Sequence, residues 1–186
     1  MSLSSETEYN SIIIPNMPKK KKWTPPNVLK TILIGCEWES ERTFLSYLKT
    51  LYYSREKGFD ITPKNMWWWS PHVTVTRVRD EGHDYKYVWT DTDRPEIEQA
   101  RTVAKKSWII LFENDPCLER EILRMLQKTK KVTDYKKEFK KHFPEESLCD
   151  ERTYEKLLPK TKIDNLRRDN SFVFEGIIRL LETGTL

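Results

Sequence analysis

Continuous apolar runs that end in acidic residues are the clearest pattern along the chain. Residues 31–37 and 86–93 each hold a short apolar, partly β-branched run, and these runs end at Glu37 and at Asp91 and Asp93. Unbroken apolar character over this length is typical of buried strands in a parallel sheet. Because the functional crevice of an open α/β sheet lies outside the carboxyl ends of its strands, we expect the three carboxylates to meet at one edge.

The rest of the pattern predicts alternating strands and helices. Apolar residues at helical spacing after a first strand predict a helix with Ser40 as its N-cap. Gly58 and Pro63 indicate a loop over 57–66, followed by a second strand over either 67–69 or 73–78. The predicted strands are 30–36, one of those two alternatives, 86–91 and 107–112. The predicted helices are 40–56, 95–105, 116–128, 134–142, 151–158 and 171–182.

This order predicts an α/β fold, in which a mostly parallel, Rossmann-like sheet is flanked by helices. At 186 residues the chain suits one compact domain with a small appendage. Four prolines within the first 28 residues preclude a long helix there, and we interpret residues 1–28 as an irregular basic arm. Residues 29–130 are predicted to form the α/β domain, and residues 131–186 a helical C-terminal extension that packs on it.

The acidic edge suggests a metal site. Carboxylates packed closely raise one another's pKa unless a cation lies among them. Oxygen ligands suit a hard ion such as Mg²⁺, or Mn²⁺, and Mg²⁺ is commonly shared between one or two carboxylates and substrate phosphate. We therefore expect Glu37, Asp91 and Asp93 to form a metal site that handles a phosphodiester. Glu41 and Glu119 are additional candidates, although an acid in a first helical turn, as at Glu119, also suits the helix dipole.

Basic and aromatic residues supply candidates for nucleic-acid binding. The net charge is only +4, but lysines are dense over 128–141 and at Lys19, Lys20, Lys21 and Lys22. Arg77 and Arg79 begin a predicted polar turn before the third strand and alternate onto one face, where either could contact phosphate. Trp67, Trp68 and Trp69 could stack on bases, although core packing explains at least one of them as well. A lysine run is also commonly just a solvated surface.

Other residues narrow the function by what they exclude. Three widely spaced cysteines and three histidines give no zinc motif, and His83, beside a turn, is a minor candidate for acid–base chemistry. Sparse cysteines without a signal peptide favour a reducing cytoplasm. No apolar run is long enough to cross a bilayer, so no membrane association is expected.

Three sequence blocks together match the pattern of a known family: residues 32–41 (ILIGCEWESE), residues 88–93 (VWTDTD) and residues 113–123 (ENDPCLEREIL). On these blocks the chain resembles Toprim domains and, more closely, the RloB family of Toprim-like proteins. The resemblance implies that Glu37 is a metal ligand or general acid/base, that Asp91 and Asp93 bind the metal, and that Glu41 and Glu119 lie nearby. It also implies a Mg²⁺-dependent nuclease acting on DNA or RNA in a restriction-linked or phage-defence system, beside an ABC-type ATPase.

Three positions depart from the family pattern. Trp38 replaces the glycine that follows the first acid, Asp115 is inserted before Pro116, and Arg120-Glu121 replace an apolar pair. A side chain at Trp38 restricts how closely the backbone can approach phosphate. A second hypothesis is therefore a catalytically divergent Toprim-like subunit that binds a nucleotide or nucleic acid, or supports the ATPase. A third is an ordinary α/β domain whose acids cap helices and end strands.

Overall fold

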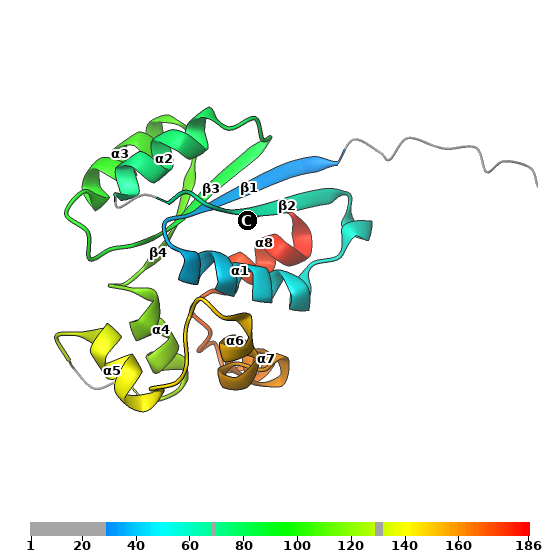
Figure 1. Cartoon of the computed structure of the whole chain (residues 1–186). Helices are drawn as coiled ribbons and strands as arrows, with labels where there is room; N and C mark the ends of the chain where they lie inside the picture. Colours follow the sequence, from blue (N-terminus) through cyan, green and yellow to red (C-terminus); the bar gives the residue numbers. More distant parts are fainter. Residues whose placement is uncertain (1–28, 68–69, 129–131) are drawn as a thin grey trace, which may run out of the picture.

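The computed structural model describes residues 29–67, 70–128 and 132–186, and its centre is a sheet of four parallel strands (Figure 1). The strand order is β2-β1-β3-β4, so the two strands with acidic ends are neighbours. The strands are β1 (Lys30–Cys36), β2 (Phe59–Asn65), β3 (Tyr85–Asp91) and β4 (Ile110–Asn114). This arrangement confirms the predicted α/β, Rossmann-like fold with a helical C-terminal part.

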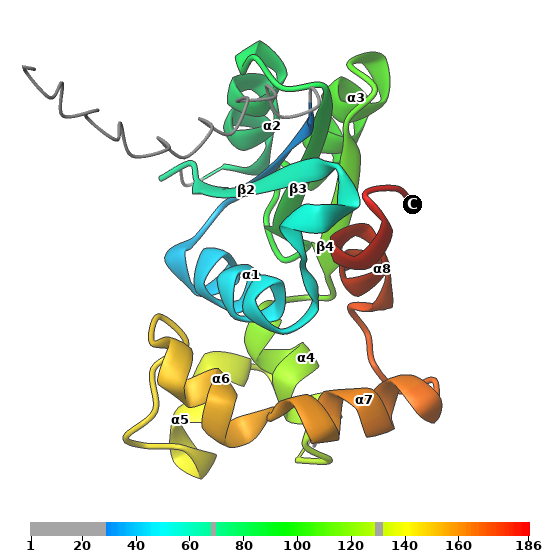
Figure 2. The same ribbon diagram turned by 90° about the vertical axis from the view of Figure 1, so that its right-hand side faces the viewer.

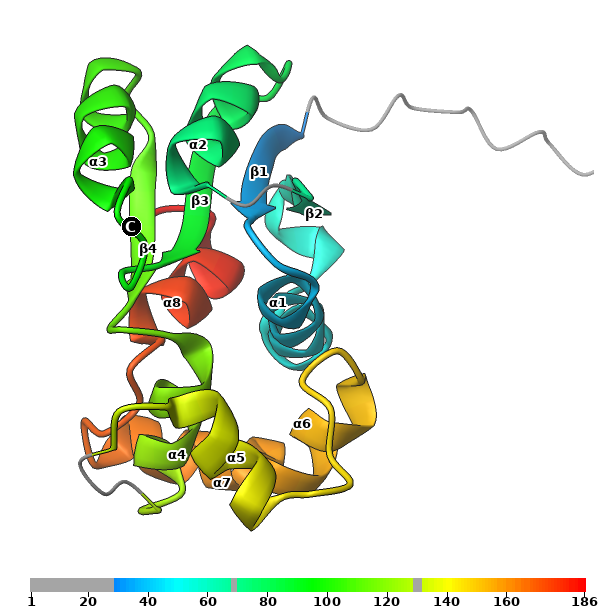
Figure 3. The ribbon, with the colours of Figure 1, turned by 60° about the vertical axis from the view of Figure 1, so that its left-hand side comes forward.

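Helices cover both faces of the sheet. Helices α2 and α3 lie on one face, and α1 and α8 lie on the other (Figure 3). Helices α4 to α7 form a further layer beyond α1, on the side away from the sheet (Figure 2). The helices are α1 (Glu39–Tyr52), α2 (Pro71–Asp80), α3 (Ile97–Lys106), α4 (Leu118–Met125), α5 (Tyr135–His142), α6 (Glu151–Leu157), α7 (Lys160–Arg168) and α8 (Glu175–Thr183), with a short 3₁₀ turn η1 (Arg55–Lys57).

The two central strands read as unbroken apolar runs because both of their faces are covered. Side chains alternate between faces along a strand, so Leu33 and Val88 pack against α2 and α3. Ile32, Ile34 and Trp89 point to the opposite side and join the larger core around α1 and α8. Hydrophobic burial on both faces fixes the register of these strands, and therefore the position of the acids that follow them.

Gly35 allows α2 to approach the sheet closely. A Cβ atom at this position would overlap the side chain of Val78 in α2 and would lie 3.3 Å from Cγ of Met66. Glycine within a strand commonly marks such a close approach. The residue is therefore explained by packing on the face opposite α1.

Aromatic side chains connect the sheet to the C-terminal helices. The ring of Phe44 in α1 stacks on Tyr154 of α6 with centroids 4.7 Å apart, and it meets Phe174 edge-on at 5.3 Å. Phe174 in turn lies 5.1 Å from the ring of Trp89 in β3. The Tyr154 hydroxyl shares its one proton between the carbonyl oxygens of Leu148 (2.7 Å) and Ser40 (3.0 Å), so this buried phenol is satisfied. The helices after residue 131 thus share one core with the sheet.

Two elements differ from the sequence prediction. Residues 59–65, predicted as a loop, form β2, an edge strand that tolerates Pro63 because only β1 pairs with it. Residues 73–78, one of the alternatives for a strand, belong to α2. Its β-branched valines imitate a strand pattern, but Pro71 stands at the first helical position after Ser70, which is typical of a helix start.

Smaller differences concern boundaries. The N-cap of α1 is Trp38 and not Ser40, and β4 begins three residues later than predicted. Helix α7 was not predicted, because Ile163 is its one fully buried residue and its pattern is weakly apolar. Residues 1–28, Trp68 and Trp69 lie outside the described residues, and the proposed division at residue 131 stays a prediction. Within the part of the chain described, no helix is long and apolar enough to span a membrane.

Candidate functional site

Pairing of β1 with β3 brings Glu37 next to the end of β3. Cys36 is the register partner of Trp89, and the Glu37 backbone N–H donates to the Trp89 carbonyl oxygen over 3.3 Å. Beyond that pair, the Thr90 hydroxyl donates to Oε2 of Glu37 over 2.6 Å. The expectation that Glu37 and Asp91 meet at one edge of the sheet follows from this register.

Glu37 is a buried carboxylate, and one of its two oxygens has no hydrogen-bond partner among the described residues. Its side chain is 0% exposed, and no donor among the described residues reaches its Oε1 atom. The nearest cation is Arg94, whose Nε lies 3.8 Å from Oε1, beyond hydrogen-bond range. Burial raises the pKa of Glu37, although the Thr90 hydroxyl, the charge of Arg94 and a backbone hydrogen bond from Asp91 oppose that shift. An additional cation at Oε1 would stabilise the ionised form.

Asp91 is held by an ordered pair of side chains. It is 3% exposed, and its Oδ1 accepts a hydrogen bond of 2.8 Å from Nδ2 of Asn114, at the end of β4. The indole Nε1 of Trp89 donates to Oδ1 of Asn114 over 2.8 Å, which fixes the orientation of the amide. Burial raises the pKa of Asp91 to about 7, against the opposing effect of the Asn114 hydrogen bond. The negative charges of Glu119, Asp93 and Glu37 add to the rise.

Arg94 lies between two of the predicted metal ligands. Its Nε is 3.8 Å from Oδ1 of Asp93 as well as 3.8 Å from Glu37. The guanidinium carbon also lies 5.2 Å from the centre of the Trp38 ring, within range of a cation–π interaction. Asp93 itself is exposed, at 42% of its side chain, so it faces solvent at the border of the acidic cluster.

Glu41 and Glu119 contribute charge to the same cluster. Glu41 is fully buried, and its Oε2 accepts a hydrogen bond of 2.6 Å from the backbone N–H of Trp38, which caps α1. Burial raises the pKa of Glu41 well above its usual value, and the charges of Asp91, Glu37 and Glu119 raise it further. The structural role of capping α1 thus coexists with membership of the acidic cluster.

The structure separates the other candidates from this cluster. Arg77 and Arg79 are exposed in the last turn of α2. Residues two apart in a helix are separated by about 200° around its axis, so these two side chains lie on nearly opposite sides and the prediction of one shared face is wrong. Arg79 also forms an ion pair with Asp80 at 2.8 Å. His83 lies just before β3, at the end of the sheet opposite the carboxylates. Lys19 to Lys22 lie outside the described residues.

The acids suit a divalent cation in their chemistry but do not form a completed set of ligands. Within residues 29–67, 70–128 and 132–186, no three acidic, histidine or cysteine side chains converge as a metal-binding group. However, the buried oxygens Oε1 of Glu37 and Oε1 of Glu41 lack donors among the described residues. Buried carboxylate oxygens without partners are costly, and a hard cation is the natural partner for them. Binding would require the carboxylates to come closer together.

Three residues of the site were missed in the sequence: Thr90, Arg94 and Asn114. Asn114 ends β4, the strand beside β3, and parallel strands that end together form a common edge. Its place at the end of a predicted strand was therefore the feature of the sequence that could have identified Asn114 as a site residue. Thr90 and Arg94 directly flank the segment that runs from Asp91 to Asp93, but the sequence does not show which flanking side chains turn toward Glu37.

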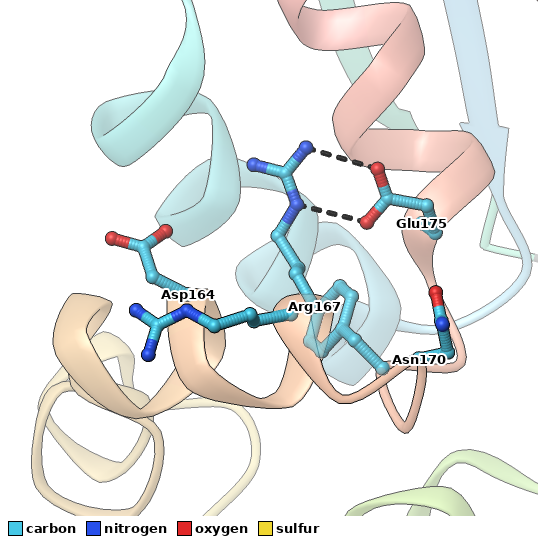
Figure 4. A pocket seen from close by; sticks show the side chains of 6 residues that line it. Asp164, Arg167, Asn170 and Glu175 are labelled. Atoms are coloured by element: carbon cyan, nitrogen blue, oxygen red, sulfur yellow. Dashed lines mark hydrogen bonds and ion pairs between the residues drawn. The ribbon is translucent and has the colours of Figure 1, made fainter.

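A hollow elsewhere on the surface has a different character. It measures about 560 Å³ and lies where α7 meets α8, with charged residues such as Asp164, Arg167 and Glu175 around it (Figure 4). Arg167 is already paired with Glu175 and with Glu182. We therefore place the candidate site at the acidic edge of the sheet, where charges are left unmatched.

Comparison with protein-family models, with curated proteins and with solved structures finds no match to this chain. The resemblance to RloB-like and Toprim proteins therefore stays a prediction. What the structure contributes independently is the arrangement of the acids: Glu37, Asp91 and Asp93 gather at the carboxyl ends of adjacent parallel strands, with Glu41 and Glu119 close enough to influence their charge.

Proposed function

We propose that the protein is a Toprim-type nuclease, dependent on Mg²⁺ or Mn²⁺, that hydrolyses phosphodiester bonds in DNA or RNA. Glu37, Asp91 and Asp93 would hold the cation. The observation that carries the proposal is the buried carboxylate of Glu37 with an unpartnered oxygen, directly beside the nearly buried Asp91. Such groups lower the stability of a fold. They are found mainly at functional sites, where the function accounts for their presence.

Each residue has a distinct part in this proposal. A bound divalent cation would neutralise charge on the phosphate and lower the pKa of a water molecule. Asn114 and Trp89 hold Asp91 in one orientation, as outer partners of metal ligands do. The Thr90 hydroxyl holds Oε2 of Glu37 and leaves Oε1 available. Asp93, being exposed, is the acid that an incoming substrate or hydrated ion meets first.

A second candidate function is a non-enzymatic Toprim-like subunit that binds nucleic acid or a nucleotide. The position of Arg94, 3.8 Å from both Glu37 and Asp93, favours it, because a guanidinium already supplies positive charge there. In this alternative Arg94 takes the place of the metal ion, and no hydrolysis follows. If the protein binds metal but cleaves no nucleic acid, or binds no metal at all, the result favours this candidate over the nuclease.

The wider setting belongs to the proposal as well. The family resemblance suggests a restriction-linked or phage-defence role and an ABC-type ATPase as partner. A cytoplasmic location is supported by the cysteines, since Cys36, Cys117 and Cys149 are all free thiols. None of these three features depends on whether the site is catalytic.

The test is a cleavage assay with purified protein on single- and double-stranded DNA and RNA, in Mg²⁺, Mn²⁺ or EDTA. We expect cleavage that requires metal and disappears in the Asp91→Ala and Asp93→Ala variants. Arg79→Gln, which changes a charge remote from the cluster, is the matched control and should cleave normally. Cleavage that survives both aspartate substitutions would exclude this site as the source of the activity.

A further inference from the structure

Helix α5 presents a continuous row of lysines. Lys136, Lys137, Lys140 and Lys141 are all exposed, and their spacing places them within an arc of about 140° on one side of the helix. The opposite side is apolar: Phe139 is 2% exposed and belongs to the main core. We call the four lysines the α5 lysine face.

The charges of this face are only partly matched. Lys141 is 3.8 Å from Glu138, a loose ion pair at the surface, and Lys140 donates to the carbonyl oxygen of Glu146 over 2.7 Å. Among the described residues, the side chains of Lys136 and Lys137 have no acidic partner. By contrast, Lys156 and Lys160 on the neighbouring helices each pair with an acid. The positive charge of α5 therefore remains available to a partner.

Helix α5 is linked to the acidic cluster through helix α4. Helix α5 packs on α4, whose first turn carries Glu119, the acid that raises the pKa of Asp91. Arg120 of α4 lies 5.9 Å from the ring centre of Tyr135, the first residue of α5. Both helices lie beyond the carboxyl edge of the sheet, on the side where the acids gather (Figure 3). Helix α5 thus lies next to the helix that carries Glu119, at the same end of the sheet as the acidic cluster.

We propose that the α5 lysine face binds the phosphodiester backbone of the nucleic acid beside the acidic cluster. The identity of the ligand rests on the proposed function. Without a bound metal ion, the five acids outnumber the single cation that the described residues place among them, Arg94, so most of the affinity for the strand has to come from cations outside the cluster. Electrostatic contacts from lysines supply most non-specific affinity for nucleic acid. The lysines bind the strand and the acids act on it, which separates binding from chemistry.

A membrane surface fits this face less well than nucleic acid does. Helices that lie on bilayers insert an apolar side between the headgroups. The apolar side of α5 is already packed against the protein core through Phe139, and Tyr135 and Phe143 are partly buried beside it. Only the charged side is available. A nucleic-acid backbone can bind to the charged side alone, because it does not require apolar side chains to insert into it.

Binding is measured by fluorescence anisotropy in EDTA, with a labelled 20-nucleotide single-stranded DNA as the probe and with salt varied. We expect substitution of all four lysines by glutamine to weaken binding at least tenfold at low salt. It should also lower the slope of log affinity against log salt by about 3, since each phosphate contact contributes roughly 0.7. The double variant K136Q/K137Q should lower the slope by about 1.4.

The matched control is K105Q/K106Q, which removes two exposed lysines from the end of α3, remote from the carboxyl edge. Equal losses in the two double variants would overturn the proposal, because net charge alone would then explain binding. Binding of phosphatidylserine vesicles but not of the oligonucleotide would also overturn it. Lysine-dependent binding by a protein that cleaves nothing would support this surface while the nuclease fails. Metal-dependent cleavage by the wild type, together with unchanged oligonucleotide affinity in the four-lysine variant, would support the nuclease while this surface fails.

Discussion

Two charged clusters of the molecule differ in how completely their charges are matched. At the junction of α7 and α8, the guanidinium of Arg167 forms two hydrogen bonds with Glu175, at 2.8 and 2.9 Å, and two with Glu182, at 3.0 and 3.1 Å. At the carboxyl edge of the sheet, Arg94 approaches Glu37 and Asp93 only to 3.8 Å. The first cluster is saturated, whereas the second leaves buried acids unsatisfied.

The difference separates charges that hold the fold from charges that are kept for another purpose. A bidentate arginine between two carboxylates stabilises the junction between two helices. Buried carboxylates with raised pKa values lower stability, and strongly perturbed groups concentrate at functional sites. The comparison predicts that substitutions in the two clusters have opposite consequences for stability and for function.

The largest effect should be a pH-dependent gain in stability on Asp91→Asn. The pKa of Asp91 rises from 3.8 to about 7 in the folded protein, so the native state binds the proton more tightly than the unfolded state. The cost of ionising Asp91 is absent below about pH 4, grows up to about pH 7 and is constant above. In EDTA, the free energy of unfolding of Asp91→Asn relative to wild type should rise over that interval by at most about 4 kcal/mol. A difference that stays constant from pH 4 to pH 8 would contradict this environment for Asp91.

Glu37→Gln should reduce metal-dependent cleavage by at least about 100-fold, since loss of even an outer partner of a metal ligand commonly costs 10- to 100-fold. The amide preserves the shape of the side chain and an acceptor for Thr90, but it removes the charge. Initial rates on a labelled oligonucleotide measure the effect. Arg167→Gln is the control from the saturated cluster, and its folded protein should cleave at the wild-type rate. A similar loss in both variants would mean that the assay reports folding.

Arg167→Gln should lower the free energy of unfolding by about 1–2 kcal/mol, a value reduced by the partial exposure of its partners. The substitution leaves Glu175 and Glu182 without their common cation. Urea denaturation followed by circular dichroism measures this loss. Unchanged stability would show that the α7–α8 junction does not depend on its ion pairs.

The smallest effect concerns the cation already present at the site. Arg94→Gln should raise the affinity for Mn²⁺ about three- to tenfold, because a guanidinium 3.8 Å from Glu37 and Asp93 repels a divalent ion. Arg94→Lys preserves the charge and should bind Mn²⁺ much as wild type does. Isothermal titration calorimetry measures both affinities. A weaker affinity in Arg94→Gln would instead assign Arg94 a supporting part in holding the metal ligands.

The sequence predicted the centre of the sheet well, and its edges less well. Strand β1 matches its predicted range, and β3 ends where predicted, because strands covered on both faces are apolar without interruption. Strand β2 alternates polar and apolar residues and contains Pro63, so its pattern was indistinguishable from a loop. Residues 73–78 of α2 have the β-branched composition of a strand, which is why the sequence leaves a strand there as one alternative.

The candidate site was predictable as far as the backbone determines it. Strand register alone places Glu37 beside the end of β3, and the DxD spacing brings Asp93 to the same region. The sequence could not show that Oε1 of Glu37 lacks a donor within the described chain, or that Asn114 orients Asp91. These features depend on side-chain rotamers and on contacts between residues far apart in the sequence.

The central claim is that unsatisfied acids at the carboxyl edge bind a divalent cation. Titration of the protein with Mn²⁺, followed by the loss of the free-ion signal in electron paramagnetic resonance, tests it most directly. The account predicts one bound Mn²⁺ in wild type and in Arg167→Gln, and none in Asp91→Asn or Glu37→Gln at the same concentrations. Wild-type protein that binds no Mn²⁺, or aspartate and glutamate variants that bind it as well as wild type does, would contradict the claim.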